Sequence, residues 1–167
     1  TIDNTLAATQ SLGAGESASD TVTVRTADGT TEAITITISG TNDVPTVSGV
    51  VTGSSTDAGS IFTIDLRAGA TDADTSDTLI TTGVTLVSGD ATGATVNADN
   101  TISVDPSVYK HLGVGQDLDI TYAYDVVDTN GASVSQTAVI TVTGTNDAPV
   151  ITGDVGGSVI EDGTSVS

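Results

Sequence analysis

The chain repeats itself, and this internal repeat limits its fold more than any other feature of the sequence. The motif Gly-Thr-Asn-Asp-Val-Pro at residues 40–45 returns as Gly-Thr-Asn-Asp-Ala-Pro at residues 144–149, which is 104 positions later. Residues 11–16 return at residues 111–116, which is 100 positions later. A period of this length corresponds to a whole small domain. The 167-residue chain therefore contains one complete copy and parts of two others.

The prolines that close the two motifs indicate where the domains meet. Pro45 and Pro149 lack a backbone N–H and have a fixed φ, so each interrupts a strand ladder and favours an extended connection. We therefore expect the C-terminal part of one repeat at residues 1–43, a complete repeat at residues 44–147 and the first strand or strands of a third at residues 148–167. The connections between them are expected to be short linkers rather than flexible tethers.

Apolar and polar residues alternate along much of the chain, which predicts β-strands. Three isoleucines within residues 34–38 alternate with threonines, and one face of residues 117–126 carries leucine, isoleucine, tyrosine and valine. Further strands are expected near residues 47–52, 62–66, 79–87, 94–97, 101–104 and 138–142. With about seven strands in the complete repeat and no helical periodicity of useful length, the sequence predicts an all-β fold. We expect tandem immunoglobulin-like or cadherin-like β-sandwiches with Greek-key connections.

The charge of the chain excludes two classes of partner. The chain has 22 acidic residues against three lysines and arginines, and its net charge is −19. Such a surface repels nucleic acid and anionic lipid, so we expect no nucleic-acid partner. No stretch approaches the roughly 18 apolar residues of a membrane span, so we expect no membrane insertion. Disorder is the usual interpretation of a strongly acidic chain, but the positive mean hydropathy and the regular β-branched runs argue against it.

Acidic and amide side chains are expected to gather at both ends of the complete repeat. In a sandwich whose strands alternate up and down, successive connections fall at alternate ends of the domain. The residues expected at the end where the chain enters are Asn42, Asp43, Asp72, Asp74, Asp77 and Asp128. Those expected at the exit end are Asp57, Asp105, Asn146 and Asp147.

A calcium ion suits these clusters better than the other metals do. Two unpaired carboxylates about 6 Å apart repel each other by roughly 3 kcal/mol at an effective dielectric near 20, and lysine and arginine are almost absent. Carboxylate, amide and carbonyl oxygens on loops suit Ca²⁺, whereas zinc or copper would require histidine or cysteine. Residues 72–77 are not an EF-hand loop, which has a central glycine and a terminal glutamate. Aspartate is also a common turn residue, so only the convergence of separate loops supports a ligand role.

Several motifs taken together resemble a known repeat family. They are Asn100, Ser103-Val104-Asp105-Pro106, Tyr109, Leu112-Gly113, Gly115-Gln116, the strand that contains Tyr122, Asp128 and the motif at residues 144–149. With these residues the chain resembles the VCBS and bacterial cadherin-like repeats of large RTX-type, type I secreted adhesins, and residues 1–45 match the same pattern. The motif Gly-Thr-Asn-Asp-x-Pro at its 104-residue period is the most specific part of the resemblance.

The resemblance implies a set of calcium ligands. The residues that it places at one site or pair of sites are Asn42, Asp43, Asp72, Asp74 and Asp128. Those that would begin the next site, completed by loops beyond Ser167, are Asp57, Asp105, Asn146 and Asp147. The chain departs from the cadherin pattern at two positions, because Asp57 stands where cadherins usually have glutamate and no acid follows Asp105-Pro106. Both departures would weaken the second site.

The resemblance also implies a function. The repeat would be a calcium-rigidified extender, or spacer, of a giant bacterial surface adhesin, and would project an adhesive region for cell-surface or biofilm attachment. This implies an extracellular location on the bacterial surface, with the secretion signal outside residues 1–167. Since the chain has no cysteine, calcium rather than disulfide bonds would stabilise the secreted domain. The expected partners are neighbouring repeats of the same chain, and the incomplete ends could also pair head to tail between copies.

Two other functions stay open from the sequence alone. The domain could itself be a ligand- or sugar-binding module, although sugar sites usually need an aromatic platform and the chain has no tryptophan. It could also be an accessory β-sandwich domain of a secreted enzyme. A catalytic role for the chain itself is not expected, because its one histidine, His111, aligns with Ser11 in the other copy.

Overall fold

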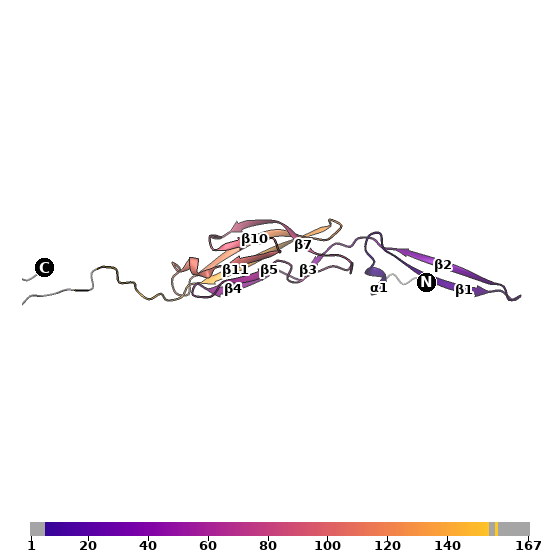
Figure 1. Cartoon of the computed structure of the whole chain (residues 1–167), viewed down its shortest axis with the longest axis horizontal. Helices are drawn as coiled ribbons and strands as arrows, with labels where there is room; N and C mark the ends of the chain where they lie inside the picture. Colours follow the sequence, from indigo (N-terminus) through magenta and orange to yellow (C-terminus); the bar gives the residue numbers. More distant parts are fainter. Residues whose placement is uncertain (1–5, 154–155, 157–167) are drawn as a thin grey trace, which may run out of the picture.

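The computed structural model describes residues 6–153 and 156 and shows an elongated molecule (Figure 1). The residues predicted to end the first repeat form a one-turn helix, α1 (Ala7–Gln10), and an antiparallel hairpin of β1 (Ser17–Arg25) and β2 (Thr31–Ser39). This hairpin extends from one end of the complete repeat along the same long axis (Figure 1). The two parts of the molecule therefore follow each other in line.

The complete repeat contains two main sheets. The four-stranded sheet has the order β4-β11-β10-β7, and the three-stranded sheet has the order β5-β9-β8. All neighbours are antiparallel except β4 and β11, which are parallel. The strands of the first sheet are β4 (Val51–Thr56), β7 (Ile80–Ser88), β10 (Asp117–Val127) and β11 (Ser133–Thr143). Those of the second are β5 (Phe62–Asp65), β8 (Ala94–Val96) and β9 (Thr101–Val104), and the 3₁₀-helix η1 (Pro106–Tyr109) follows β9.

One hydrophobic core lies between the two main sheets. Ile120 of β10 and Ile140 of β11 lie opposite each other and are fully buried, as is Ile102 of the facing sheet. Full burial of such a side chain contributes about 1.5–3 kcal/mol. The Tyr124 hydroxyl donates a hydrogen bond to the Leu66 carbonyl at 2.8 Å, so its polar atom is satisfied inside the core. The arrangement is that of a β-sandwich.

The structure confirms the all-β fold and refines the predicted strands. The complete repeat has nine strands, β3 to β11, where about seven were predicted. The additional strands are short, because β3 (Thr46–Val47) and β6 (Ala70–Thr71) pair with each other over only two residues. The strand predicted near residues 47–52 is broken at Gly49, whose φ of 151° favours glycine. After this break the chain leaves β6 and continues as β4 beside β11.

The hairpin of the incomplete repeat corresponds to β10 and β11 of the complete one. Each strand of the complete repeat's hairpin is two residues longer, which accounts for the two offsets of 100 and 104 positions. The face that corresponds to the core face of β10 and β11 carries Val22, Val24 and Ile34, which are 47%, 42% and 49% exposed. Within residues 6–153 and 156, no second sheet covers this face.

The third repeat is described only in part. Residues 148–153 and 156 are described, and they contain no strand. The rest of the strand region expected within residues 148–167 lies outside the described residues. The head-to-tail pairing of incomplete ends involves the same residues and stays a prediction.

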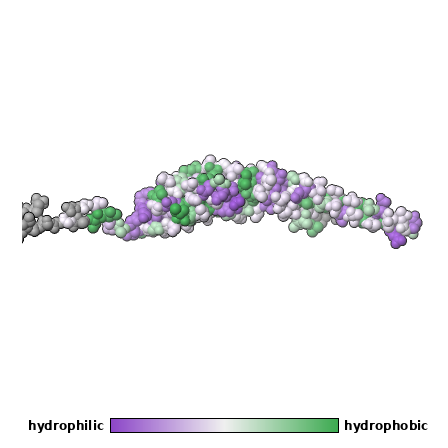
Figure 2. Space-filling view, viewed as in Figure 1, coloured by the Kyte–Doolittle hydropathy of each residue, from purple (hydrophilic) through white to green (hydrophobic). Residues whose placement is uncertain are grey.

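The surface of the molecule is mixed in polarity on the face shown in Figure 2. Hydrophobic residues are scattered there among hydrophilic ones, and no broad apolar patch is visible on that face. In the part of the chain that the structure describes, no helix is long and apolar enough to cross a membrane.

Substitution of core residues tests this architecture. Ile140→Ala removes a fully buried side chain and leaves a cavity, so we expect the free energy of unfolding to fall by about 2–5 kcal/mol. Ile34→Ala changes a half-exposed isoleucine of the hairpin and should cost no more than about 0.5 kcal/mol. Urea unfolding followed by circular dichroism measures both values, and similar losses in the two variants would contradict the assignment of the core.

Candidate cation site at the junction between repeats

Three segments that are far apart in the sequence meet at the end where the chain enters the complete repeat. They are the linker at residues 40–45, the loop at residues 72–77 after β6, and the turn at residues 128–132 between β10 and β11. The Asn42 side-chain amide donates to Asp128 Oδ2 at 2.8 Å. The Asp43 backbone N–H donates to Asp74 Oδ2 at 2.7 Å. The linker is thus hydrogen-bonded to both the loop and the turn.

The loop at residues 72–77 folds so that its carboxylates share one side. Asp72 Oδ1 accepts a hydrogen bond from the backbone N–H of Asp74 at 2.9 Å, which is the local bond that aspartate commonly makes in turns. The backbone N–H of Asp77 donates to the Asp74 carbonyl at 3.1 Å. As a result, one carboxylate oxygen from each of these aspartates lies within 4.8 Å of the others. Three acidic groups at this spacing form a candidate metal site.

Three buried oxygens at this junction have no hydrogen-bond partner among the described residues. They are Asn42 Oδ1, Asp72 Oδ2 and Asp74 Oδ1. Asp74 is only 1% exposed, so water has little access to it. A buried polar atom without a partner costs about 1–3 kcal/mol, and a charged one costs more. A cation with oxygen ligands is the kind of partner that such atoms lack, and the carboxylates of Asp72 and Asp74 are close enough to share one.

Asp128 is held in its ionised form although it is 4% exposed. Burial by itself would raise its pKa, but hydrogen bonds from the Asn42 amide and from the backbone N–H groups of the turn outweigh this effect and lower the pKa. The N–H groups of Asn130 and Ala132 donate to Asp128 Oδ1 at 2.9 and 2.8 Å. The turn therefore presents a buried anion to the junction.

The matching turn of the first hairpin does not carry an acid at this position. Thr26 stands where the complete repeat has Asp128, and both residues donate their backbone N–H across the turn, to Thr30 and Ala132 respectively. The acid lies two residues later, at Asp28, where a hydrogen bond from the Thr26 hydroxyl lowers its pKa to about 2. The two turns share the same backbone hydrogen bond, but their aspartates stand at different positions.

The exit end of the complete repeat is organised differently. Asp57 is fully buried, and its Oδ1 accepts hydrogen bonds from the backbone N–H and the hydroxyl of Thr145 at 2.9 and 2.5 Å. The Thr145 hydroxyl is the main cause that lowers the pKa of Asp57, against the effect of burial. Asp57 Oδ2 is buried without a partner among the described residues. At this end, Asp57 is therefore held through one carboxylate oxygen, and its other oxygen has no partner among the described residues.

The other acids predicted at the exit end are not drawn together with Asp57. Asp105 caps η1, because its Oδ1 accepts hydrogen bonds from the Ser107 backbone N–H and hydroxyl at 3.0 and 2.6 Å. Asn146 and Asp147 are exposed. Within the described residues, no hydrogen bond joins these side chains to Asp57. The structure thus brings together the six residues predicted at the entry end but not the four predicted at the exit end.

Three contacts at these junctions were not predicted from the sequence. The Asn130 side-chain amide donates to both carboxylate oxygens of Asp77 at 3.3 Å. Gly13 is buried against Asp74, and Thr145 anchors Asp57. The repeat itself carried a signal for two of them, because Leu-Gly at residues 12–13 and Gly-Thr at residues 40–41 both recur in the second copy.

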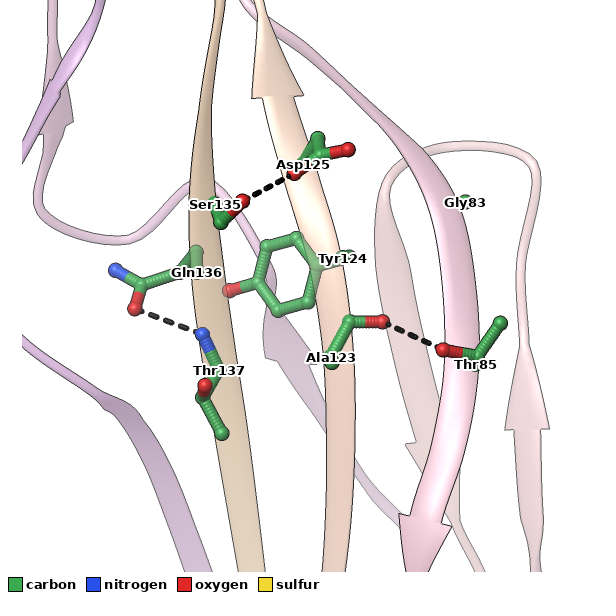
Figure 3. Close-up of a pocket in the computed structure, with 8 residues that line it drawn as sticks. All are labelled: Gly83, Thr85, Ala123, Tyr124, Asp125, Ser135, Gln136 and Thr137. Carbon is green, nitrogen blue, oxygen red and sulfur yellow. Dashed lines mark hydrogen bonds between the residues drawn. The ribbon is translucent and has the colours of Figure 1, made fainter.

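A separate groove lies on the outer face of the four-stranded sheet (Figure 3). It has a volume of about 370 Å³ and is lined by Gly83, Thr85, Ala123, Tyr124, Asp125, Ser135, Gln136 and Thr137. The Ser135 hydroxyl donates to Asp125 at 2.7 Å inside it. Tyr124 is the aromatic residue of this lining, but it is 3% exposed and its hydroxyl is bonded to Leu66 in the core. The groove therefore has no aromatic platform on which a sugar could stack.

No protein-family model matches the chain, and no curated protein matches it either. The resemblance to VCBS and cadherin-like repeats therefore rests on the sequence motifs, and the interpretation of the junction rests on its geometry.

The hydrogen bond between Asn42 and Asp128 can be tested by titration in the absence of divalent cations. Asn42→Ala removes the strongest of the interactions that lower the pKa of Asp128, so that pKa should rise. Because the folded-state pKa of Asp128 lies below its unfolded value, this carboxylate stabilises the fold above about pH 4, and the stabilisation is lost as pH falls through the folded value. In the variant this loss should begin at a higher pH.

Carboxyl chemical shifts measured by NMR between pH 2 and 6 give this pKa directly. Asn97→Ala is a matched control, because Asn97 makes its hydrogen bonds with Thr101 and Ser103 instead. An unchanged Asp128 titration in Asn42→Ala would contradict the proposed pairing.

Proposed function

We propose that the chain is part of an array of immunoglobulin-like or cadherin-like repeats, with Greek-key connections, that calcium stiffens into a spacer. The observation that carries this proposal is the set of three buried oxygens without partners at the junction, on Asn42, Asp72 and Asp74. They lie where the linker enters the complete repeat, between two parts of an elongated molecule (Figure 1). A cation bound there would hold the linker to the repeat.

The chemistry of the donor atoms favours calcium. The cluster offers carboxylate and amide oxygens, which are hard ligands, and it contains no histidine or cysteine. In the part of the chain that the structure describes, the one ion pair joins Arg67 to Asp65. No lysine or arginine there pairs with the acids of the junction. Ca²⁺ also accepts irregular geometry with six to eight oxygen ligands, so backbone carbonyls and water can complete its shell.

Stiffening follows from where the ligands come from. Asn42 and Asp43 belong to the linker, whereas Asp72, Asp74 and Asp128 belong to the complete repeat. Carboxylates about 6 Å apart repel by roughly 3 kcal/mol at an effective dielectric near 20. Without a cation, the three clustered carboxylates of the loop therefore repel one another beside the linker. With the cation bound, the same groups become a clamp that restricts bending at the linker.

An extracellular role agrees with the affinity expected for such a site. Extracellular calcium modules bind with dissociation constants of about 10⁻⁴ to 10⁻³ M. External calcium would fill the site, and the much lower cytoplasmic calcium would leave it empty. The array would therefore stiffen after export and project an adhesive region from a bacterial surface, as the family resemblance implies.

Two alternative functions have less support. A sugar-binding module would use an exposed aromatic residue, and the outer groove of Figure 3 lacks one. An accessory domain of a secreted enzyme would need no cation at a domain junction. Binding of the chain to a glycan array, with no response to calcium, would favour the first alternative.

The calcium site is tested by melting the chain with and without the ion. At free calcium about tenfold above the dissociation constant, each site adds about 1.4 kcal/mol of stability, which raises the melting temperature by roughly 5–10 °C for a domain of this size. In Asp74→Asn this increase should be largely lost, because the variant removes a buried anionic ligand. Calorimetric scans in EDTA and in millimolar calcium measure the difference.

Asp119→Asn provides the matched control for charge. Asp119 lies on the exposed face of β10, where it accepts a hydrogen bond from Thr141 at 2.6 Å, and its loss removes the same charge. This variant should keep the full calcium response. If wild-type chain melts at the same temperature in EDTA and in calcium, the proposal is wrong.

Small-angle scattering tests the mechanical part of the proposal. Bound calcium should restrict bending between the hairpin and the complete repeat, so the longest dimension of the molecule should be greater in calcium than in EDTA. Asp74→Asn should give the shorter, EDTA-like value in both solutions. An equal length in all four samples would contradict stiffening by calcium.

A further inference from the structure

A turn of the preceding repeat lies against the acidic loop at residues 72–77. Residues 12–16 fold into a tight turn in which Glu16 Oε2 accepts a hydrogen bond from the Gly13 N–H at 3.0 Å. The Glu16 N–H donates back to the Gly13 carbonyl at 3.0 Å, and the Gly40 N–H donates to the Glu16 carbonyl at 2.9 Å. These bonds fasten the turn to the linker, two residues before Asn42.

Gly13 brings the backbone of this turn directly against Asp74. Gly13 is buried, and a Cβ atom placed on it would lie 3.2 Å from Ser76 Oγ, 3.4 Å from Asp74 Cγ and 3.5 Å from Asp74 Cβ. A side chain there would meet Asp74 at van der Waals distance and would press on the Ser76 hydroxyl, so the glycine keeps the backbone of the turn in direct contact with the loop. The carboxylate in contact is the one that has a buried oxygen without a partner.

We propose that the turn at residues 12–16 is a docking surface for the acidic loop at residues 72–77 of the following repeat. The inference rests on the proposed function. Docking fixes the position of the Asp74 carboxylate, and cation binding to that carboxylate holds the docked arrangement. Since linkage between two binding events is reciprocal, seating of the preceding repeat and binding of the cation strengthen each other.

The exit end carries the same turn with no loop docked on it among the described residues. Gln116 Oε1 accepts a hydrogen bond from the Gly113 N–H at 3.0 Å, and the Gly144 N–H donates to the Gln116 carbonyl at 2.8 Å. Gly113 is exposed, and a Cβ atom on it would approach only Gln116 Oε1, at 3.7 Å. The repeat thus presents at its exit the surface that a following acidic loop of the same kind would fit.

Paired glycine substitutions test the docking surface. Neither Gly13 nor Gly113 has a backbone in the left-handed region, so alanine strains neither turn and differs only in what its Cβ meets. In Gly13→Ala the calcium dissociation constant at the junction should rise about five- to tenfold, a size typical of coupled sites. In Gly113→Ala it should stay within about twofold. NMR titration of the amides of residues 72–77 reports the affinity at this site alone.

Two further measurements separate docking from simple packing. Ser76→Ala added to Gly13→Ala removes the closest contact and should restore most of the calcium affinity. Without calcium, the Asp43 amide, which donates to Asp74 Oδ2, should exchange faster in Gly13→Ala than in wild type.

Each outcome decides one of the two proposals. Unchanged calcium affinity and unchanged Asp43 exchange in Gly13→Ala would overturn the docking surface while leaving the calcium spacer intact. If Gly13→Ala lowered the free energy of unfolding equally with and without calcium, the docking surface would also be overturned, because Gly13 would then act only in packing. No calcium response in wild type would refute the spacer, and the Asp43 exchange would still report whether the turn positions Asp74.

Discussion

Asp74 connects the linker to the complete repeat through one of its two carboxylate oxygens. One oxygen accepts a hydrogen bond from the Asp43 N–H in the linker, and the other is buried without a partner among the described residues. A buried anion is tolerable only when it is hydrogen-bonded, paired or bound to a metal. The linker, the loop after β6 and the turn after β10 all contribute to this environment. The geometry of the junction therefore depends on how the charge of Asp74 is satisfied.

The β-sandwich makes this convergence possible. The continuous pairing of β10 with β11, from Asp117 opposite Thr143 to Val127 opposite Ser133, fixes the turn that carries Asp128 at the entry end. Pairing of β3 with β6 holds the start of the loop at residues 72–77 beside the linker. The core that locks these strands contains aliphatic residues and buried tyrosines, and no ligand is required inside it. The candidate cation site lies outside this core, at the entry end of the domain.

The two ends of the complete repeat differ in which predicted ligands they bring together. At the entry end, the turn at residues 12–16 and the loop at residues 72–77 are both present and in contact through Gly13 and Asp74. At the exit end, Asp57 is anchored by Thr145, but Asp105 is committed to capping η1 and Asn146 and Asp147 are exposed. Among the described residues, the exit end therefore positions one carboxylate, and no hydrogen bond joins the other predicted ligands to it.

The sequence predicted the all-β class, which the structure confirms. It also predicted domain boundaries at the repeated motif and a set of ligands at the entry end, and both of these stay predictions. These follow from local alternation, from proline chemistry and from the rule that successive connections lie at opposite ends. Only the tertiary structure decided that the first strand breaks at Gly49, that Asn130 contacts Asp77 and that Gly13 lies against Asp74. Those contacts join residues 53 and 61 positions apart, and their distances depend on how whole sheets and turns pack. Spacing along a chain specifies which residues are near an end, whereas packing specifies which atoms touch.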